Sequence, residues 1–488
     1  MKLKKLLKNI PVKEIKGSTE IEITGISSNS KLVSPGSLFI ARKGRSDDGE
    51  KYIPEAIASG ALAIVTDIAN PFLKNVTQIV PKETSLIEGM LAANYYKCAS
   101  QELFMVGVTG TNGKTTTSFL VKHLLDHLGK KCGLIGTIEY ILGNMCYRAT
   151  MTTPDVISNH KMLREMRLQG CSSAVMEVSS HALDQDRVFN IDFDVAIFTN
   201  LSLDHLDYHK DMEEYASAKN KLFSSLNQKS FKKKTAIVNK DSPFVDKILD
   251  GCSQNVLTYG IYKEADVMAK EICLSASLTT FNLLYKNKTY FCQSKLIGRF
   301  NVYNYLAAIS VGLSNSFPPE KLIEILSSFV AVPGRLQPVD NPLGIKIYVD
   351  FAHSDDALKN VLECLSELKT KRIITVFGCG GDRDRNKRPK MAEVAEQFSD
   401  YTIVTSDNPR SENSEDIASE IVRGFKKKSS YEVVLDRYFA IKRAIEISDV
   451  DDIILIAGKG HETYQIFAHQ TIEFDDRKIA EELTLNRK

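Results

Sequence analysis

The chain has 488 residues, of which 43% are hydrophobic and 25% are charged, and its formal net charge at pH 7 is +2. This composition predicts a soluble globular protein of about two to four domains, and the near-zero charge excludes a global basic surface for nucleic acid. No apolar run approaches the length of a membrane span, and the basic N-terminus lacks the apolar core of an export signal. Together with nine scattered cysteines, an odd number, this predicts a cytoplasmic protein with reduced thiols.

The first hundred residues predict a small α/β unit. Residues 37–41 and 61–66 are short apolar runs with the character of strands, and residues 53–59 between them have helical spacing. Gly60 follows this helical segment, at the position where glycine ends helices.

Residues 104–116 have the order strand, glycine-rich loop, helix. Backbone N–H groups of such a loop and the positive end of the helix can hold a triphosphate. Lys114 can reach the β- and γ-phosphates, and the Thr115 hydroxyl can bind Mg²⁺. Val108 occupies a position where the standard P-loop has glycine, so the loop is a variant. The predicted nucleotide contacts are Gly110, Thr111, Asn112, Gly113, Lys114, Thr115 and Thr116. Nucleotide binding alone is compatible with a switch, a motor or a ligase.

Strands and helices alternate from about residue 101 to 330, which predicts a largely parallel sheet with helices on both faces. A helix over residues 156–168 is expected, with Asp155 as its N-cap and Gly170 at its end. The expected strands are residues 104–108, 174–178, 195–199 and 236–239. In such sheets the functional loops lie at the carboxyl ends of the strands.

Four segments in this region carry candidate chemistry. Glu177 ends a buried strand and offers the oxygen ligands that Mg²⁺ prefers. His205 lies in residues 199–209, which hold two histidines and two aspartates just after a strand. Lys219 lies in the helical segment 215–223, and residue chemistry alone predicts a solvated surface lysine there. Asn301 and Asn304 begin a further helix, where asparagine can cap the helix or bind a purine edge.

Val332-Pro-Gly-Arg335 marks the start of a second doubly wound unit without a dinucleotide-binding fingerprint. Its expected strands are residues 345–349, 373–377, 401–405, 432–435 and 453–457. Polar loops follow them at residues 350–353, 378–385, 407–410 and 458–462. Arg383 and Arg410 suit bidentate carboxylate recognition, and Glu462 can meet an ammonium. These loops predict a small zwitterionic or polycarboxylate substrate.

The order of these motifs resembles that of the Mur ligases along the whole chain. The residues that carry the resemblance are 109–116, 177–183, 200–209, 215–223, 298–308, 332–335, 350–353, 378–384, 407–410 and 458–462. The resemblance implies an α/β protein of three domains. Residues 1–100 would form a small α/β domain for the UDP substrate, 101–331 a P-loop-type doubly wound domain for ATP, and 332–488 a Rossmann-like domain for the incoming amino acid. A hinge is expected near residues 332–335.

The resemblance also implies roles for individual residues. Lys219 would be carbamylated by CO₂ and would hold a second Mg²⁺ with His205 and Glu177, while Thr115 and Glu177 hold the first. These residues and Lys114 form the implied catalytic set. Further implied nucleotide contacts are Asn301, Asn304, Arg335 and Asp350. Contacts to the UDP-linked substrate fall on Ser30, Thr152, Thr153, Ser179, Gln185 and Arg187. Contacts to the amino acid fall on Arg383, Asp407, Asn408, Pro409, Arg410, Gly458 and Glu462.

The implied activity is an ATP-dependent amide ligation in peptidoglycan synthesis. A monomer would join meso-2,6-diaminopimelate to the D-Glu of UDP-N-acetylmuramoyl-L-alanyl-D-glutamate through an acyl phosphate. The tetrapeptide Asp407-Asn-Pro-Arg410 marks the diaminopimelate-adding type in this family. Three alternatives remain: folylpolyglutamate synthetase, a lysine-adding Mur ligase, and a nucleotide-dependent regulatory protein without ligase activity.

Overall fold

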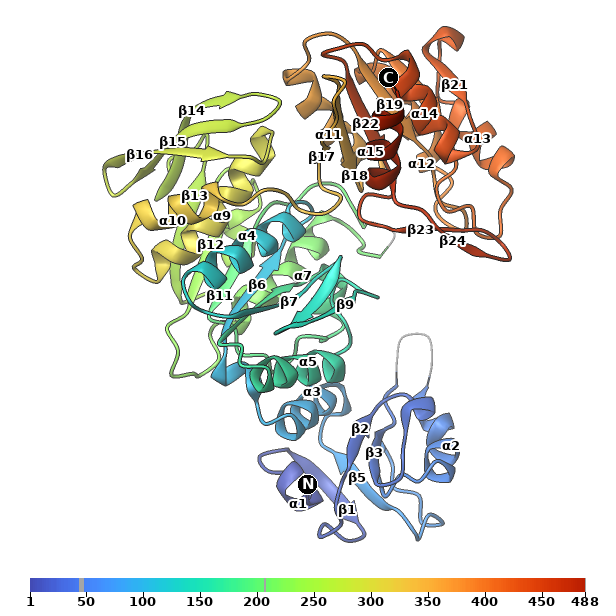
Figure 1. Ribbon diagram of the computed structural model, residues 1–488. Helices are drawn as coiled ribbons and strands as arrows, with labels where there is room; N and C mark the ends of the chain where they lie inside the picture. The colour runs from blue at the N-terminus through green and yellow to red at the C-terminus, as the bar shows by residue number, and fades with distance from the viewer. Residues whose placement is uncertain (44–47, 206–207, 488) are drawn as a thin grey trace. The chain divides into compact units, whose positions relative to one another are not determined.

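The computed structural model describes residues 1–43, 48–205 and 208–487 (Figure 1). The chain forms two compact units. The first, unit 1, contains Met1–Val267 and Leu306–Pro319, and the second, unit 2, contains Met268–Tyr305 and Glu320–Lys488. The division into three functional domains stays a prediction.

A five-stranded sheet forms the N-terminal part of unit 1, in the order β1-β5-β4-β3-β2. β2 to β5 are parallel neighbours, whereas β1 pairs antiparallel with β5. The expected strands and helix are confirmed as β3, β4 and α2, and Gly60 follows α2 with φ of 96°. The bounds are α1 Leu3–Leu6, β1 Val12–Lys16, β2 Gly25–Ser27, β3 Ser37–Ile40, α2 Ile53–Ala58, β4 Ala63–Val65, β5 Thr77–Pro81 and α3 Thr84–Tyr95.

The second sheet of unit 1 has the order β13-β12-β11-β6-β10-β7-β8-β9. From β13 to β7 the neighbours are parallel, while β7, β8 and β9 form an antiparallel meander that the sequence did not indicate. β10, β11 and β12 are buried throughout, as expected for parallel strands with covered faces. The bounds are β6 Phe104–Thr109, β7 Cys132–Ile135, β8 Glu139–Leu142, β9 Met145–Arg148, β10 Ser173–Glu177, β11 Val195–Phe198, β12 Thr235–Asn239 and β13 Asn255–Gly260.

Helices of this sheet begin at the positions that their caps dictate. Asp155 caps α5 through the Ser158 N–H, and α5 covers the predicted residues 156–168. α4 begins at Lys114, directly after the glycine-rich loop, because Gly113 in the left-handed region (φ 83°) forms its N-cap. The bounds are α4 Lys114–His127, α5 Val156–Leu168, α6 Ser180–Asp184, α7 Met212–Ser225 and α8 Val245–Leu249.

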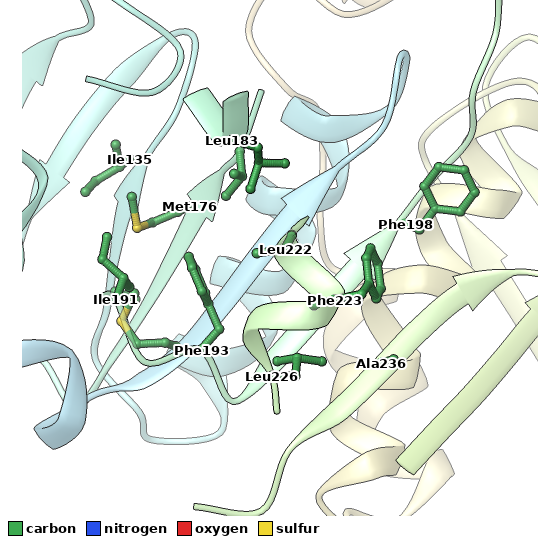
Figure 2. Close-up of a cluster of buried hydrophobic side chains, with 14 of the residues drawn as sticks. Ile135, Met176, Leu183, Ile191, Phe193, Phe198, Leu222, Phe223, Leu226 and Ala236 are labelled. Atoms are coloured by element: carbon green, nitrogen blue, oxygen red, sulfur yellow. The ribbon is translucent and has the colours of Figure 1, made fainter. Parts of the chain in front are cut away.

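A cluster of buried apolar side chains fixes α7 against the sheet (Figure 2). Leu222 and Phe223 from α7 belong to it, as do Met176 of β10 and Phe198 of β11. Gly107 in β6 leaves room for the contact, since a Cβ there would come within 2.9 Å of Phe193 and 3.1 Å of Leu222. This packing positions Lys219 of α7 at the glycine-rich loop after β6.

Unit 2 is built on a six-stranded sheet in the order β17-β18-β22-β19-β20-β21. All neighbours are parallel except the edge strand β17. The five expected strands are confirmed as β18 to β22, with ends that differ by a residue or two at most. The bounds are β17 Gln337–Val339, β18 Lys346–Asp350, α11 Asp355–Glu367, β19 Ile373–Phe377, α12 Lys387–Phe398, β20 Tyr401–Val404, α13 Ser414–Val422, β21 Tyr431–Val433, α14 Arg437–Ile447, β22 Ile453–Ala457 and α15 Asp476–Asn486.

The rest of unit 2 consists of antiparallel strands and helical segments outside that sheet. β15 pairs with β16, and β23 pairs with β24 in a small hairpin after β22. The bounds are β14 Val267–Leu274, β15 Thr279–Tyr285, β16 Lys288–Ser294, α9 Arg299–Ser314, α10 Pro319–Ser327, β23 Tyr464–Ile466 and β24 Thr471–Glu473. Val267, residues 306–314 of α9 and Pro319 are assigned to unit 1. Within the described ranges, every helix is too short or too polar to serve as a membrane span.

Candidate active site

The glycine-rich loop after β6 is held in place by the segment that follows β11. The Thr111 N–H donates to the Asn200 carbonyl (2.9 Å), and the Asn112 N–H donates to Asn200 Oδ1 (2.9 Å). The Thr199 hydroxyl donates to the Asn112 carbonyl (2.6 Å). Gly110, at φ of 151°, has no space for a side chain because a Cβ would collide with the Thr199 hydroxyl. The loop therefore has a fixed shape set by its neighbouring strand.

The side chains of two lysines meet at this loop. Lys114 Nζ donates to the carbonyls of Gly110 (2.9 Å) and Thr111 (2.8 Å), so its side chain folds over the loop. Lys219 Nζ from α7 donates to the same Gly110 carbonyl (3.0 Å). Thr115 and Thr116 are buried in the first turn of α4. A helix N-terminus with the Lys114 ammonium beside it is suited to bind negative charge.

Lys219 is almost fully buried, with 1% of its surface exposed, which contradicts the solvated lysine that residue chemistry alone predicts. Its Nζ lies 4.4 Å from the centre of the Tyr215 ring. Burial lowers the pKa of Lys219 well below its usual value, repulsion from Lys114 lowers it further, and attraction from Asp204 only partly opposes this. The physical reason for the wrong prediction is tertiary: α7 packs this side chain under the loop. A buried amine with a lowered pKa is neutral more often and hence more nucleophilic.

Glu177 ends β10 beside β6 and is fully buried. Its Oε2 accepts hydrogen bonds from the hydroxyls of Thr115 (3.0 Å) and Thr137 (2.9 Å), and its Oε1 accepts from the Thr137 N–H (2.9 Å). The carboxylate thus lies directly beside the first turn of α4. Gly136 permits this, since a Cβ there would come within 2.5 Å of Glu177 Oε1.

Thr137 is a site residue that sequence reasoning missed. It follows β7, at the start of the unpredicted meander, and its hydroxyl also lies 3.1 Å from the Thr152 hydroxyl. Because the single Thr137 proton goes to the Glu177 carboxylate, Thr152 must be the donor in the Thr152–Thr137 pair. A directed chain of hydrogen bonds therefore joins Thr152 to Glu177. The sequence did hold one indication of this role. Thr137 follows the apolar run Cys132–Ile135, which has the character of a buried strand, and functional residues are expected at strand ends.

His205 has φ of 56°, in the left-handed region, and lies close to several aromatic rings. Its Nε2 is 3.6 Å from Asp204 Oδ2, and its ring centroid is 4.9 Å from that of His181 and 6.0 Å from that of Tyr215. Residues 206–207 of the predicted polar segment, including Asp207, lie outside the described residues. In the part of the chain that the structure describes, no group of three or more His, Cys, Asp or Glu side chains is arranged to hold a metal. The metal set Thr115, Glu177, His205 and Lys219 stays a prediction.

The residues predicted to contact the UDP-linked substrate form one network, with Ser30 apart from it. The Thr153 hydroxyl donates to the Glu177 carbonyl (2.7 Å) and accepts from the Ser179 N–H (3.1 Å). Arg187 donates through Nη1 to the Thr153 carbonyl (3.0 Å) and through Nη2 to Gln185 Oε1 (2.6 Å). This network touches Glu177 and so brings the two predicted sites together.

Ser30 is buried in the N-terminal sheet region, where its hydroxyl donates to Glu55 Oε2 (2.7 Å). In unit 2, Asn301 and Asn304 on α9 are both buried. Asn301 Nδ2 donates to the Ile297 carbonyl (2.8 Å), and Asn304 Nδ2 donates to Asn301 Oδ1 (2.9 Å). The two asparagines thus fix each other's orientation, beyond what helix capping alone requires.

Asp350 ends β18, as predicted, and is buried. Its carboxylate accepts hydrogen bonds from the N–H groups of Leu336 (2.7 Å) and Ala352 (2.8 Å). Burial raises the pKa of Asp350, and attraction from Arg335 and these hydrogen bonds oppose the rise only in part. The Arg335 guanidinium lies 5.1 Å from the centre of the Phe351 ring. The Val332–Arg335 segment is therefore tied to the end of β18.

Two of the predicted amino-acid loops are interlocked. The Gly381 N–H donates to the Asn408 carbonyl (2.9 Å), and Arg410 Nη1 donates to the Gly381 carbonyl (2.8 Å). A Cβ on Gly381 would collide with the Pro409 carbonyl, so glycine is required for this approach. Arg410 has φ of 53°, and Arg383 extends to solvent and donates to the neighbouring Asp382 carbonyl (3.0 Å).

The third amino-acid loop, after β22, meets the second. Asn408 Nδ2 donates to Glu462 Oε2 (2.8 Å). A Cβ on Gly458, which has φ of 110°, would come within 2.5 Å of Asp407 Oδ2. Asp407, Asn408, Arg410, Gly458 and Glu462 thus gather at the carboxyl edge of one sheet, as the sequence predicted.

Arg388 holds these loops together, and the sequence did not indicate this role either. It is fully buried on α12 and forms ion pairs with Glu412 (2.9 Å) and Glu420 (2.7 Å). Its Nη2 also lies 3.3 Å from the Gly380 carbonyl, and Glu412 accepts from the Asp382 N–H (2.6 Å). The hydrogen bond from Arg388 is the main cause that lowers the pKa of Glu412 to about 2. Residues 387–390, the first turn of α12, form a basic run that is typical of a solvated surface, so the sequence did not indicate this role.

Replacement of Arg388 by methionine should lower the free energy of unfolding at pH 7 by about 3 kcal/mol, because two carboxylates lose a buried partner. In the native protein the folded-state pKa of Glu412 lies below its ordinary value of 4.5, so its stabilisation is complete above pH 4.5 and is lost as the pH falls toward about 2. The variant should lose less stability across that window.

Urea unfolding at several pH values measures both effects. Arg443→Met, which removes an exposed pair with Glu432, is the control and should cost less than about 1 kcal/mol. Equal costs for the two variants would contradict the bracing role.

Comparisons with known proteins agree along the whole chain. Residues 22–94 match the catalytic domain of the Mur ligase family, 108–312 the Mur ligase middle domain and 334–460 the Mur ligase glutamate ligase domain. UDP-N-acetylmuramoyl-L-alanyl-D-glutamate–2,6-diaminopimelate ligases of Chlamydia felis and Syntrophomonas wolfei are 44% and 42% identical, each over 99% of both chains.

Solved structures are similar over nearly the full length as well. A structure of UDP-N-acetylmuramoyl-L-alanyl-D-glutamate–2,6-diaminopimelate ligase has a TM-score of 0.71 at 32% identity, covering 97% of both chains. MurF ligase from Thermotoga maritima in complex with ADP shares the fold, with a TM-score of 0.61 at 20% identity over 96% of both chains. The chain belongs to the Mur ligase family.

Proposed function

We propose that this protein is an ATP-dependent amide ligase that adds meso-2,6-diaminopimelate to the D-Glu of UDP-N-acetylmuramoyl-L-alanyl-D-glutamate. The observation that supports the proposal is the presence, in one chain, of a glycine-rich loop contacted by Lys114 and Lys219 and of an Asp407–Arg410 loop suited to a zwitterion. Relatives that share more than 40% of the sequence are named for this reaction. The reaction would take place in the cytoplasm, where ATP and UDP-linked precursors are available, and the protein would act as a monomer.

In the first step, the γ-carboxylate of D-Glu attacks the γ-phosphate of ATP, and an acyl phosphate and ADP result. Loop residues 110–116, through the N–H groups at the start of α4 and the Lys114 ammonium, would bind and orient the phosphates. Lys114 can do this because its Nζ already lies over the loop, on the carbonyls of Gly110 and Thr111. Asn301, Asn304, Arg335 and Asp350 would bind the rest of the nucleotide.

The residues near the loop suit Mg²⁺, which prefers oxygen ligands. The buried Glu177 carboxylate and the Thr115 hydroxyl are 3.0 Å apart and could share one ion. His205 and Lys219 would complete a second site if Lys219 is carbamylated, since carbamylation turns an amine into a carboxylate-like ligand. The lowered pKa of Lys219 favours that modification, because CO₂ reacts with the neutral amine. When bound, Mg²⁺ would neutralise charge on the phosphates.

In the second step, the neutral amine at the L-centre of diaminopimelate attacks the acyl phosphate, and phosphate leaves as the amide forms. Arg410 would bind the carboxylate at the far end of the substrate, and Glu462 and Asp407 its ammonium. Arg383, Asn408, Pro409 and Gly458 would shape the remainder of this pocket. Ser30, Thr152, Thr153, Ser179, Gln185 and Arg187 would bind the UDP-linked substrate.

Phosphate release tests the proposal directly. Release should require ATP, UDP-N-acetylmuramoyl-L-alanyl-D-glutamate and diaminopimelate together, and a panel of diaminopimelate isomers, lysine and glutamate defines the amino acid. Activity with lysine would identify a lysine-adding ligase, and activity with glutamate on a folate would identify a folylpolyglutamate synthetase. Nucleotide binding without release would identify a regulatory protein.

Thr137→Val should reduce kcat/KM for the UDP-linked substrate by about 10- to 100-fold, because the Glu177 carboxylate loses a hydrogen bond and its link to Thr152. Valine keeps the shape of threonine, and the Thr137 N–H bond to Glu177 can remain. Steady-state kinetics measure the effect. Thr137→Ser keeps the hydroxyl and should restore most of the activity. If valine and serine behave alike, the hydrogen-bond chain has no role in turnover.

A further inference from the structure

Lys459 places a fully buried ammonium inside the proposed amino-acid site. It follows Gly458 in the loop after β22, and 0% of its side chain is exposed. Its Nζ donates to Asn408 Oδ1 (3.2 Å) and to Glu462 Oε2 (3.1 Å), and lies 5.4 Å from the centre of the Tyr464 ring. A buried charge is costly unless it is paired, so these contacts hold the lysine in one place.

The orientation of the Asn408 amide depends on this lysine. Two donors, Lys459 Nζ and the Ile466 N–H (3.0 Å), point at one end of the amide, which must therefore be the oxygen. The other end, Nδ2, then donates to Glu462 Oε2 (2.8 Å). If the amide were reversed, its NH₂ group would face an ammonium, and its oxygen would face a carboxylate.

The two oxygens of Glu462 differ for the same reason. Oε2 accepts hydrogen bonds from both Lys459 and Asn408, whereas Oε1 has the Tyr464 hydroxyl at 3.3 Å. Burial disfavours the charged form of Glu462, but attraction from Lys459 and the two hydrogen bonds outweigh it, and its pKa is lowered. The charge of His461 also lowers this pKa. Glu462 in turn attracts the buried Arg437, which forms its ion pair with Asp476.

We propose that Lys459 is a positioning residue for the amino-acid substrate, which fixes Asn408 in one orientation and holds Glu462 as an oriented carboxylate. Oε1 of Glu462 then receives the substrate ammonium, while Oε2 is occupied by the protein's own cation. This inference rests on the proposed function of the site. It also explains how a pocket proposed to bind the substrate ammonium can contain a buried lysine, since Lys459 pairs with Oε2 of Glu462 and leaves Oε1 for the substrate.

The test is Lys459→Met, which keeps most of the length of the side chain and removes its charge. KM for diaminopimelate should rise about 10- to 100-fold, since hydrogen bonds to charged groups are lost, while KM for ATP changes less than about twofold. Without Lys459, burial raises the pKa of Glu462, so KM for diaminopimelate should rise further as the pH falls from about 8 to about 6. The wild-type protein should not show this acid dependence of KM.

Two further variants separate positioning from general damage. Lys459→Met/Glu462→Gln should have a KM for diaminopimelate close to that of Glu462→Gln alone, because Lys459 acts mainly through Glu462 and Asn408 keeps its hydrogen bond from the Ile466 N–H. The comparison can still be made if Lys459→Met alone does not fold, because the double variant removes both charges of the Lys459–Glu462 pair. Lys234→Met removes a buried lysine paired with Asp192 (2.5 Å) in unit 1, and should leave KM for diaminopimelate unchanged.

Each result has one meaning. Unchanged KM for diaminopimelate in Lys459→Met, additive effects in the double variant, or equal increases for ATP would overturn the positioning role. A wild-type protein that releases phosphate without regard to diaminopimelate would instead overturn the proposed function.

Discussion

Replacement of Lys219 by alanine is expected to abolish turnover, with kcat reduced on the order of 10³-fold or more. The amine lies under the phosphate loop, 3.0 Å from the Gly110 carbonyl, and its lowered pKa makes it available to CO₂. Alanine removes both this contact and the proposed metal-binding carbamate. Short carboxylates such as acetate should restore part of the activity, because they can supply the missing oxygen ligands.

A readout that does not depend on activity checks the carbamate itself. Protein equilibrated with ¹³C-bicarbonate should show a carbamate carbon resonance that is absent from Lys219→Ala. Lys221→Ala is a matched control on the same helix, since its side chain is about half exposed and pairs with Asp184 (3.5 Å). It should remain active. Full activity of Lys219→Ala would reject the carbamate role.

Arg410→Lys is expected to raise KM for diaminopimelate by about 10- to 100-fold and to leave KM for ATP nearly unchanged. The Gly381 carbonyl accepts a hydrogen bond from Arg410 Nη1, which orients the plane of the guanidinium. Arginine can bind a carboxylate through two parallel hydrogen bonds, whereas lysine is a point charge without this geometry. Steady-state kinetics with each substrate varied in turn give the comparison.

The same residue predicts discrimination by the wild-type protein. Lysine lacks the second amino-carboxylate of diaminopimelate, so it would leave Arg410 without its carboxylate at a cost of about 1–3 kcal/mol. Arg423→Lys, on an exposed position at the end of α13, is the control and should behave as wild type. Comparable increases in KM for ATP and diaminopimelate in Arg410→Lys would undo the specificity assignment.

The variants of Lys219 and Arg410 probe separate steps of the proposed reaction. Lys219 lies at the phosphate loop and should affect the formation of the acyl phosphate. Arg410 lies in the amino-acid loops and should affect its consumption. A slow release of phosphate without amide formation in Arg410→Lys would be consistent with this division, because the acyl phosphate would then be lost to water.

Local sequence determined the strands, loops and helices that carry the residues of both sites. The order of strand, loop and helix around residues 104–116 follows from short-range rules, as does the start of α5 at its Asp155 cap. Alternating strands and helices predicted parallel sheets, and in such sheets the carboxyl ends of the strands meet. For that reason Glu177, Asp350 and the Asp407–Arg410 loop were predicted in their observed settings at strand ends.

Only the tertiary structure decided which side chains are buried and what they touch. The pattern of α7 is compatible with a solvated Lys219, and it is the packing of Leu222 and Phe223 that brings this lysine to a glycine 109 residues away. Thr137 reaches Glu177, 40 residues away, because β7 pairs with β10, a strand distant from it in sequence. Lys459 reads as an ordinary loop cation until Asn408 and Glu462 are placed around it. Burial and long-range hydrogen bonds depend on the whole fold, whereas caps, turns and strand ends are fixed by neighbouring residues.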